Sequence, residues 1–434
     1  MRFTVIAFLL LTIGACIKVK EEYKIIAPGI WRGVLELQPP VAKADLDELE
    51  EASLTVNGDG VFLPFLFEIK YVDETNWYVE IINGSERIII DHVTTGRNPY
   101  TGRDTVCIYF DLFDSYLSGE LNEGILVGKW VRNNRQNYQI PFVAHFGEDN
   151  LFPLPIDTPK VNFTGKWESY FEIETDHPYA SIGLFEQNKE QLTGTFMTET
   201  GDYRFLAGAV HGYELNLSVF DGAHAFLFKG KYQNDSTILG TFWSGHKYKT
   251  LWNGKKNPTF ELGHPDSLTH ISGTDSWQDL SFIDLNSQPI SLKDESLQGK
   301  VKILQIMGTW CPNCLDETKF LIEFLKTHQY PNLRVIGLAF ESYAETEKNI
   351  ERLNIYQKKL KMPYPLWYAG NYKKSEASKV LPMLNEVSAF PTMIFLDEEN
   401  HVQRIHTGFN GPATPKYAHF KEQFELNVQA LTSK

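Results

Sequence analysis

The chain has 434 residues, more than the roughly 250 to 300 residues at which a single hydrophobic core stops growing, so two or three domains are expected. Hydrophobic residues make up 42% of the chain and charged residues 22%, which excludes an extended disordered protein. The formal net charge of -14 excludes nucleic acid as a partner, because binding to phosphate backbones depends on lysine and arginine.

The N-terminal segment, MRFTVIAFLLLTIGAC, has a basic Arg2, an apolar run and the small residues Gly14 and Ala15 directly before Cys16. The apolar run is shorter than the ~18 residues of a membrane-spanning helix, so residues 1–15 are predicted to be a secretory signal peptide. The ending IGAC resembles the lipobox of bacterial lipoproteins, in which cleavage precedes the cysteine and a lipid is attached to its thiol. We therefore expect a protein on the periplasmic side of the bacterial cell envelope, anchored to a membrane through Cys16. A plain signal peptide with an incidental cysteine is the alternative.

Residues 22–257 are dominated by short runs rich in aromatic and β-branched residues, such as WRGVLEL, NWYVEII, TVCIYFDLF, YELNLSVF and AFLFKGKY. Period-two alternation, interrupted by Gly, Asn and Asp every ~8 to 12 residues, predicts antiparallel strands. Such strands close into a sandwich or a barrel, which protects their edges. Cys107, inside the run TVCIYF, is predicted to be a buried core residue.

Two similar openings, GIWRGVLEL and GKWESYFEI, and two similar endings, GILVGKWVRN and STILGTFWSG, indicate tandem β units. The proline-rich segment FPLPIDTPK lies between them and is typical of a stiff connector. We place the first unit at residues 16–150 and the second at 160–258. The topology suggests lipocalin-like barrels by analogy of strand number alone.

After a second, turn-rich connector the pattern changes to that of an α/β domain, which we place at residues 270–434. VKILQIM and LRVIGLAF are predicted to be buried strands, and LDETKFLIEFLKTHQ a helix with one apolar face. A second helix is expected at roughly residues 343–359, and a hairpin at TMIFLDEENHVQRIHTGF. Thr414 is predicted to cap a last helix that has Pro415 in its first turn.

Cys311 and Cys314, in GTWCPNC, allow three interpretations. A structural zinc site requires four ligands, and no second cysteine pair or suitably spaced histidines accompany this one: His401 and His406 lie five apart on a predicted strand and face opposite sides. A purely structural disulfide would close too small a loop to constrain the unfolded chain. A reactive thiol pair is the third interpretation, and the placement favours it. Cys311 follows a strand and begins a helix, where free amides favour a thiolate, and Cys314 lies one turn further on.

The motif GTWCPNC after a buried strand, together with SAFPTMIFLD some eighty residues later, resembles the thioredoxin-like domains of the TlpA/ResA group of exported thiol-disulfide oxidoreductases. The resemblance covers about residues 275–430. It implies that Pro391 is a cis-proline that faces the active cysteine. It also implies that Glu317 moves protons for the buried thiol of Cys314; the alternative for Glu317 is a first-turn carboxylate stabilised by the helix dipole.

The resemblance implies an enzyme that exchanges disulfides with client proteins through Cys311 and Cys314, reduced by an upstream membrane electron donor. Neither a cofactor nor a metal is expected beyond the redox-active disulfide itself. We predict the reductase direction, because Asn313, between the cysteines, and the nearby Gln305 and Glu317 add no positive charge that would stabilise a thiolate.

Two alternatives to the reductase remain open. One is a disulfide oxidase or isomerase. The other is a β-barrel lipoprotein that binds an unknown ligand or partner, with the thiol domain as an auxiliary part.

Overall fold

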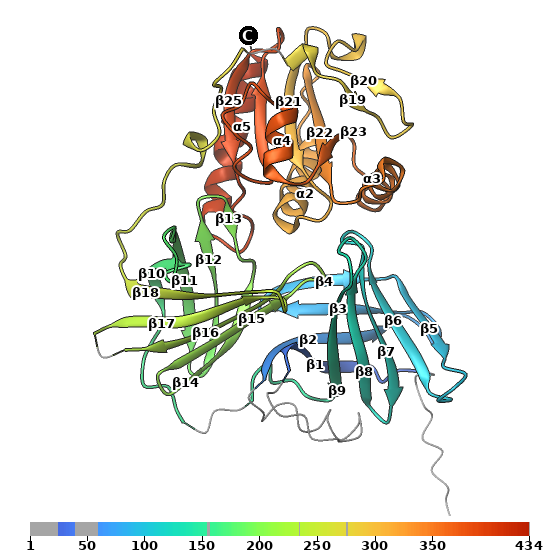
Figure 1. Cartoon of the computed structure of the whole chain (residues 1–434), viewed down its shortest axis with the longest axis vertical. Coiled ribbons are helices and arrows are strands. Elements are labelled where there is room, and N and C mark those ends of the chain that lie inside the picture. The colour runs from blue at the N-terminus through green and yellow to red at the C-terminus, as the bar shows by residue number, and fades with distance from the viewer. Residues whose placement is uncertain (1–24, 40–59, 154–156, 234, 275–276, 434) are drawn as a thin grey trace, which may run out of the picture.

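The structure, a computed structural model, describes residues 25–39, 60–153, 157–233, 235–274 and 277–433 (Figure 1). The predicted signal peptide and Cys16 lie outside these residues. The described chain forms two nine-stranded antiparallel sheets, followed by a seven-stranded mixed sheet with helices. The predicted fold class is confirmed in that all-β units precede an α/β domain.

The first sheet has the strand order β4-β3-β2-β1-β9-β8-β7-β6-β5. It is a meander in which the first and last strands also pair, so that β4 and β5 form its two ends and the sheet remains open. Its strands are β1 (Gly29–Gln38), β2 (Val61–Tyr71), β3 (Trp77–Asn83), β4 (Glu86–Ile90), β5 (Val93–Arg97), β6 (Asp104–Phe110), β7 (Ser115–Asn122), β8 (Ile125–Arg132) and β9 (Tyr138–Phe146).

The second sheet has the order β11-β10-β18-β17-β16-β15-β14-β12-β13, and an additional pairing of β11 with β12 closes it into a barrel. Full closure removes the free sheet edges that would otherwise be exposed. The strands are β10 (Gly165–Phe171), β11 (Tyr179–Asn188), β12 (Gln191–Thr198), β13 (Gly201–Asp202), β14 (Leu206–His211), β15 (Glu214–Phe220), β16 (Ala225–Tyr232), β17 (Thr237–Ser244) and β18 (Tyr248–Lys256).

The repeated sequence openings occupy equivalent places in the two sheets. Trp31 in β1 and Trp167 in β10 are both fully buried. Each indole N–H donates to the carbonyl oxygen four residues earlier, at 3.0 Å to Ala27 and 2.8 Å to Phe163. The repeated endings fall on β8 and β17, the penultimate strands. The sequence echo therefore corresponds to the same local structure in both units.

Cys107 does not belong to the core, and that prediction was wrong. Residues of β6 alternate between the two faces of the sheet, so the buried neighbours are Val106 and Ile108 while Cys107 is only partly buried. Its thiol lies 3.3 Å from the Ser118 hydroxyl. Both faces of TVCIYF carry apolar residues, and the inner face is the one that begins at Val106.

The third sheet has the order β20-β19-β23-β22-β21-β24-β25. All seven residues of its central strand β21 are buried, because side chains of α2 and α5 cover one face and those of α4 the other. The strands are β19 (Phe282–Ile283), β20 (Pro289–Ile290), β21 (Val301–Met307), β22 (Leu333–Glu341), β23 (Leu366–Asn371), β24 (Thr392–Leu396) and β25 (Val402–Thr407). The α-helices are α2 (Pro312–Thr327), α3 (Thr346–Leu360), α4 (Lys374–Val380) and α5 (Lys416–Thr432). Short 3-10 turns are η1 (Pro265–Ser267), η2 (Trp277–Asp279) and η3 (Glu295–Leu297).

Two details of the predicted helices differ in the structure. Helix α3 begins at Thr346, because Tyr343 lies in a loop held by Asn349, whose side chain accepts from the Tyr343 amide at 3.1 Å. Thr414 does not cap α5: its hydroxyl donates to the Gly411 carbonyl at 3.0 Å, and Pro415 stands at the cap position without a side-chain bond.

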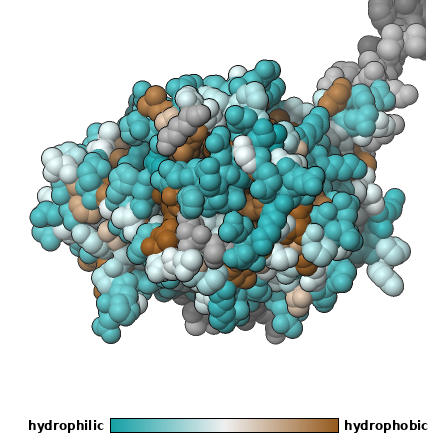
Figure 2. All heavy atoms as spheres, turned by 90° about the horizontal axis from the view of Figure 1, so that it is seen from above, coloured by the Kyte–Doolittle hydropathy of each residue, from teal (hydrophilic) through white to brown (hydrophobic). Residues whose placement is uncertain are grey.

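The α/β domain lies over the two β units, which stand side by side (Figure 1). The β units contact each other directly: Asn83 and Phe220 exchange two hydrogen bonds of 3.0 and 3.2 Å, and the rings of Phe65 and Phe220 lie 4.6 Å apart. Seen from above, the molecule presents a mainly hydrophilic face with apolar residues only in narrow strips (Figure 2). None of the helices in the described part of the chain is long and apolar enough to cross a membrane.

Candidate active site

Cys311 and Cys314 form a disulfide at the N-terminus of α2. Cys311 occupies the cap position with an extended backbone, Pro312 starts the helix, and the Cys314 amide donates to the Cys311 sulfur at 3.1 Å. Free amide groups and the helix dipole at such a position stabilise a thiolate. Cys311 is 6% exposed and Cys314 is 0% exposed, so Cys311 is the cysteine closer to solvent.

The loop before the cysteines depends on a glycine. A Cβ atom on Gly308 would lie 2.2 Å from the Trp310 indole nitrogen, so only glycine allows the indole to fold back over this turn. The Trp310 N–H donates to the Phe340 carbonyl at 2.9 Å, and its ring meets Phe390 edge-on at 5.4 Å. These contacts hold the segment that presents Cys311.

Pro391 lies in the loop before β24, and the Phe390–Pro391 peptide bond is cis. The carbonyl oxygen of Phe390 lies 3.6 Å from the Cys311 sulfur. The Gly408 amide donates to the Pro391 carbonyl at 2.8 Å. The loops at residues 308–311 and 390–391 therefore border the disulfide, and the loop 408–411 is bonded to the second of them.

Glu317 points into the protein from α2 and is 0% exposed. Gln305 of β21 donates to Glu317 Oε2 at 3.0 Å, while Oε1 has no hydrogen-bond partner. Burial raises the pKa of Glu317 well above its usual range, and the bond from Gln305 offsets this only in part. The alternative for Glu317, a first-turn carboxylate stabilised by the helix dipole, would lower this pKa, which is opposite to the effect of its burial.

Gln305 organises the polar groups beneath the helix. Its amide nitrogen also donates to the Thr318 hydroxyl at 3.1 Å, and its oxygen accepts from the Tyr364 hydroxyl at 3.0 Å. Gln305 is fully buried and fully hydrogen-bonded in this way. It fixes the orientation of Glu317 without adding charge.

A second buried carboxyl group, Glu341, was missed in the sequence. It stands at the carboxyl end of β22 and accepts two bonds from Thr309, from the amide at 2.7 Å and from the hydroxyl at 2.8 Å. Burial raises the pKa of Glu341 to about 7. An acid directly after the apolar run LRVIGLAF was the available signal, because carboxyl ends of parallel strands meet at one sheet edge.

Residues of the β units also reach this site. Asn313, between the cysteines, donates to the Asp202 carbonyl at 3.4 Å, and Arg204 pairs with Asp316 of α2. No local sequence pattern marks these contacts, since they join segments more than 100 residues apart. Within the described ranges, no group of three or more His, Cys, Asp and Glu side chains is arranged to hold a metal ion.

The comparisons with known proteins concern the C-terminal part of the chain. Residues 254–419 match the family Redoxin, so this part is a Redoxin domain with a thioredoxin-like fold and a cysteine pair. No curated protein matches.

Three solved structures represent the structural matches. DsbF of Mycobacterium tuberculosis has 17% identity and a TM-score of 0.27, over 37% of this chain and 100% of that chain. A thiol:disulfide interchange protein from Chlorobium tepidum has 21% identity and a TM-score of 0.27, over 35% of this chain and 92% of that chain. A secreted disulfide oxidoreductase from M. tuberculosis, homologous to E. coli DsbE, has 17% identity and a TM-score of 0.27, over 36% of this chain and 100% of that chain.

Proposed function

We propose that the protein is a thiol-disulfide oxidoreductase of the TlpA/ResA group that reduces disulfides of client proteins through Cys311 and Cys314. The observation that carries this proposal is the placement of the pair: a disulfide at the start of α2, with the Cys311 sulfur 3.6 Å from the loop of Pro391. We assign the chemistry to residues 270–434 and keep 16–150 and 160–258 as the boundaries of the β units.

The reaction transfers two electrons from the cysteine pair to the client. The Cys311 thiolate attacks one sulfur of the client disulfide, forming a mixed disulfide and releasing the other client sulfur as a thiolate. The Cys314 thiolate then attacks the Cys311 sulfur and releases the second client thiolate. The client is now reduced and the Cys311–Cys314 disulfide is restored. A membrane thiol donor must reduce this disulfide before the next cycle.

We assign Glu317 the role of accepting the proton that the buried thiol of Cys314 loses. Cys314 must lose a proton before it attacks, and it is completely buried. Burial raises the pKa of Glu317 and so makes its carboxylate a stronger proton acceptor, and Oε1 of Glu317 has no hydrogen bond within the described protein. Glu317 is thus a proton acceptor for the resolving step.

Mixed-disulfide trapping tests the assignment of the two cysteines. In the full chain, with Cys107→Ser to remove the partly exposed third thiol, Cys314→Ala should accumulate covalent adducts with a disulfide-containing client such as insulin. Cys311→Ala should form none, because the attacking thiol is gone. Equal trapping by both variants, or by neither, would contradict the proposal.

The reductase direction is supported by the charges around α2. Arg204, the cation that approaches Asp316, is also paired with Glu86 at 2.7 Å and therefore leaves no uncompensated positive charge there. We expect a reduction potential well below the about -120 mV of a strong oxidant of this fold. Equilibration against glutathione buffers measures it. A value at or above that of the oxidant would favour the oxidase or isomerase alternative.

Export and lipid anchoring at Cys16 complete the proposal and rest on the sequence alone. They place the thiol domain on the periplasmic side of the cell envelope, where disulfides of clients form. Cys16→Ser should move the protein from the membrane fraction to the soluble envelope fraction. Retention of the variant in the membrane fraction would remove the lipid anchor from the proposal.

The ligand-binding alternative gains no support from the interior of the second barrel. Aromatic rings contact one another across it: Phe228 and Phe242 lie 4.3 Å apart, Phe196 and Phe228 4.8 Å, and Phe171 and Phe196 5.1 Å. An interior packed in this way holds no lipocalin-like cavity. For the second unit, these contacts favour a role of its outer surface and loops over a ligand cavity.

A further inference from the structure

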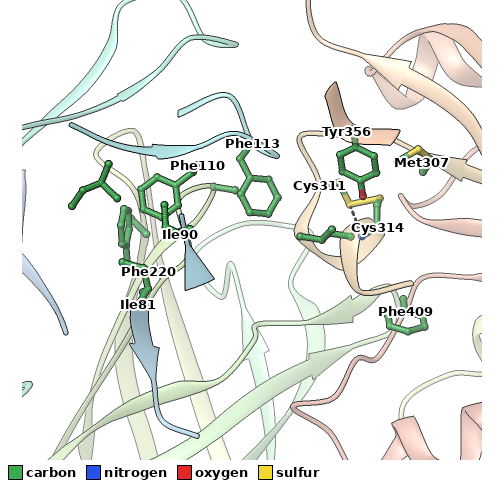
Figure 3. Packing of buried hydrophobic residues seen from close by; sticks show 14 of the residues in the cluster. Ile81, Ile90, Phe110, Phe113, Phe220, Met307, Cys311, Cys314, Tyr356 and Phe409 are labelled. Atoms are coloured by element: carbon green, nitrogen blue, oxygen red, sulfur yellow. Dashed lines mark hydrogen bonds between the residues drawn. A yellow bond between two sulfur atoms is a disulfide. The ribbon is translucent and has the colours of Figure 1, made fainter. Parts of the chain in front are cut away.

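The two cysteines are closely covered in this structure. A client sulfur must bond directly to the Cys311 sulfur, and Cys311 is only 6% exposed. Segments of both β units lie next to the cysteine pair. Phe110 and Phe113 of the first unit belong to the same buried apolar cluster as both cysteines, and Phe113 lies on the side that faces the disulfide (Figure 3).

The second β unit contributes the hairpin that carries β13, Gly201 to Arg204. Gly201 forms a parallel β-bridge with Phe409, and the Asp202 carboxylate accepts from the Gly411 amide at 2.6 Å. A Cβ atom on Gly201 would lie 2.2 Å from the side chain of Asn313, so the backbone itself rests on the active-site motif. The hairpin thus contacts the loop 408–411 and the first turn of α2, which carries the cysteine pair.

A buried ion-pair group fastens this hairpin. Arg204 is 4% exposed and pairs with Asp316 of α2 and with Glu86 of the first unit, the latter at 2.7 Å. Asp221 of the second unit lies 3.7 Å from the same guanidinium. One arginine therefore connects both β units to the helix that begins at the cysteines.

The first β unit is fastened separately, by the loop Phe110–Asp114 between β6 and β7. Arg352 of α3 donates to the Asp111 carbonyl at 2.5 Å, and Lys359 pairs with the Asp111 carboxylate at 2.8 Å. The Tyr343 hydroxyl donates to Asp114. These contacts position Phe113 beside the disulfide.

We propose that the β units hold the redox centre in a closed state, in which the loop Phe110–Asp114 and the hairpin Gly201–Arg204 occupy the surface over which a client chain reaches Cys311. Exchange with a protein client requires these two segments to separate from the α/β domain, whereas a small thiol reagent needs far less space. The inference rests on the proposed function, since it concerns access to the same cysteines. Polar and ionic contacts within one chain are compatible with such opening.

Labelling of the reduced cysteine with reagents of two sizes tests this closed state. The full chain with Cys107→Ser is reduced and reacted with iodoacetamide or with a maleimide that carries a large polyethylene glycol. Arg204→Gln should raise the rate with the large reagent, but loss of a buried ion pair can also unfold the protein. Lys359→Glu provides the second variant, because Lys359 is partly exposed and the change turns attraction to Asp111 into repulsion.

Lys359→Glu should accelerate the large reagent about fivefold and the small reagent much less, since one partly exposed ion pair shifts an opening equilibrium by roughly that factor. Lys358→Glu is the matched control: the same charge change at the preceding, exposed residue, which forms no ion pair in the described chain. Unchanged rates in Lys359→Glu, or equal acceleration by both variants, would overturn the proposal. Labelling needs only a reduced thiol, so this result is independent of whether insulin is reduced.

Discussion

The interiors of the second β unit and of the α/β domain are built on different principles. Within the barrel, Phe171 contacts five other aromatic rings besides Phe196, and the core is held by apolar packing: Tyr179, Tyr203, Phe228, Phe242 and Trp252. Beneath the disulfide, by contrast, the α/β domain buries two carboxyl groups, Glu317 and Glu341. Burying an acid costs stability unless the group is neutral, so packing alone does not account for these two side chains.

The largest expected effect is on the free energy of unfolding, from a substitution in the interior of the barrel. Phe171→Ala should lower the free energy of unfolding by about 3 to 5 kcal/mol, because it removes a large ring from a packed core. The reduction potential of the cysteine pair should stay unchanged. Urea denaturation and glutathione equilibration measure the two quantities.

The matched control for this prediction is Leu239→Ala on the outer face of β17, where the side chain is 51% exposed. It should change stability by less than about 0.5 kcal/mol. A shift of the potential in Phe171→Ala would show that the barrel interior influences the redox centre, and the comparison would fail.

Glu341→Gln should have the next largest effect on the free energy of unfolding, and at pH 8 it should stabilise the protein where Phe171→Ala destabilises it. The pKa of Glu341 is raised from 4.5 in the unfolded chain to about 7 in the folded protein. The folded state therefore holds its proton more tightly, and stability falls as pH rises between these values. The amide removes this pH dependence, while its NH2 group no longer accepts one of the two bonds from Thr309. The stability of the variant relative to the wild type should therefore be about 2 to 3 kcal/mol higher at pH 8 than at pH 5.

Urea denaturation at the two pH values checks this, with Glu347→Gln at an exposed position of α3 as the control. An equal gain at both pH values would mean that packing, and not ionisation, accounts for the change.

Glu317→Gln should have the smallest effect on the free energy of unfolding but should clearly slow the resolution of the mixed disulfide. The variant should fold, because the amide is neutral and keeps an oxygen toward Gln305. Resolution of the mixed disulfide should be slowed about a hundredfold near neutral pH, at the low end of general base effects. Stopped-flow measurement across pH gives the rate. Glu323→Gln, exposed on the same helix, should match the wild type; a wild-type rate in Glu317→Gln would assign the residue to structure alone.

The sequence was sufficient where structure depends on neighbours along the chain. Strand alternation predicted the β units, and the buried run of β21 before GTWCPNC predicted the strand and helix that frame Cys311. The inward position of Glu317 could not be derived from spacing alone, because every residue of α2 from Cys314 to Thr318 is buried, including the polar ones.

The remaining errors come from contacts between distant segments. Asp202 and Arg204 contact Asn313 and Asp316, next to the cysteines, only because two β units pack against the α/β domain. Nothing in their local sequence indicates this. Cys107 was misplaced because both faces of β6 carry apolar residues, so alternation alone does not identify the inner one.

The pairing of first and last strands has a consequence for the history of such chains. In the first unit β1 lies beside β9, with Trp31 opposite Phe146, and in the second β10 lies beside β18, with Trp167 opposite Lys256. The chain therefore enters and leaves each unit at neighbouring points. A unit whose two ends are adjacent can be duplicated, inserted or deleted without changing the path of the rest of the chain. This gives a route by which a thiol domain can acquire two such β units one after the other.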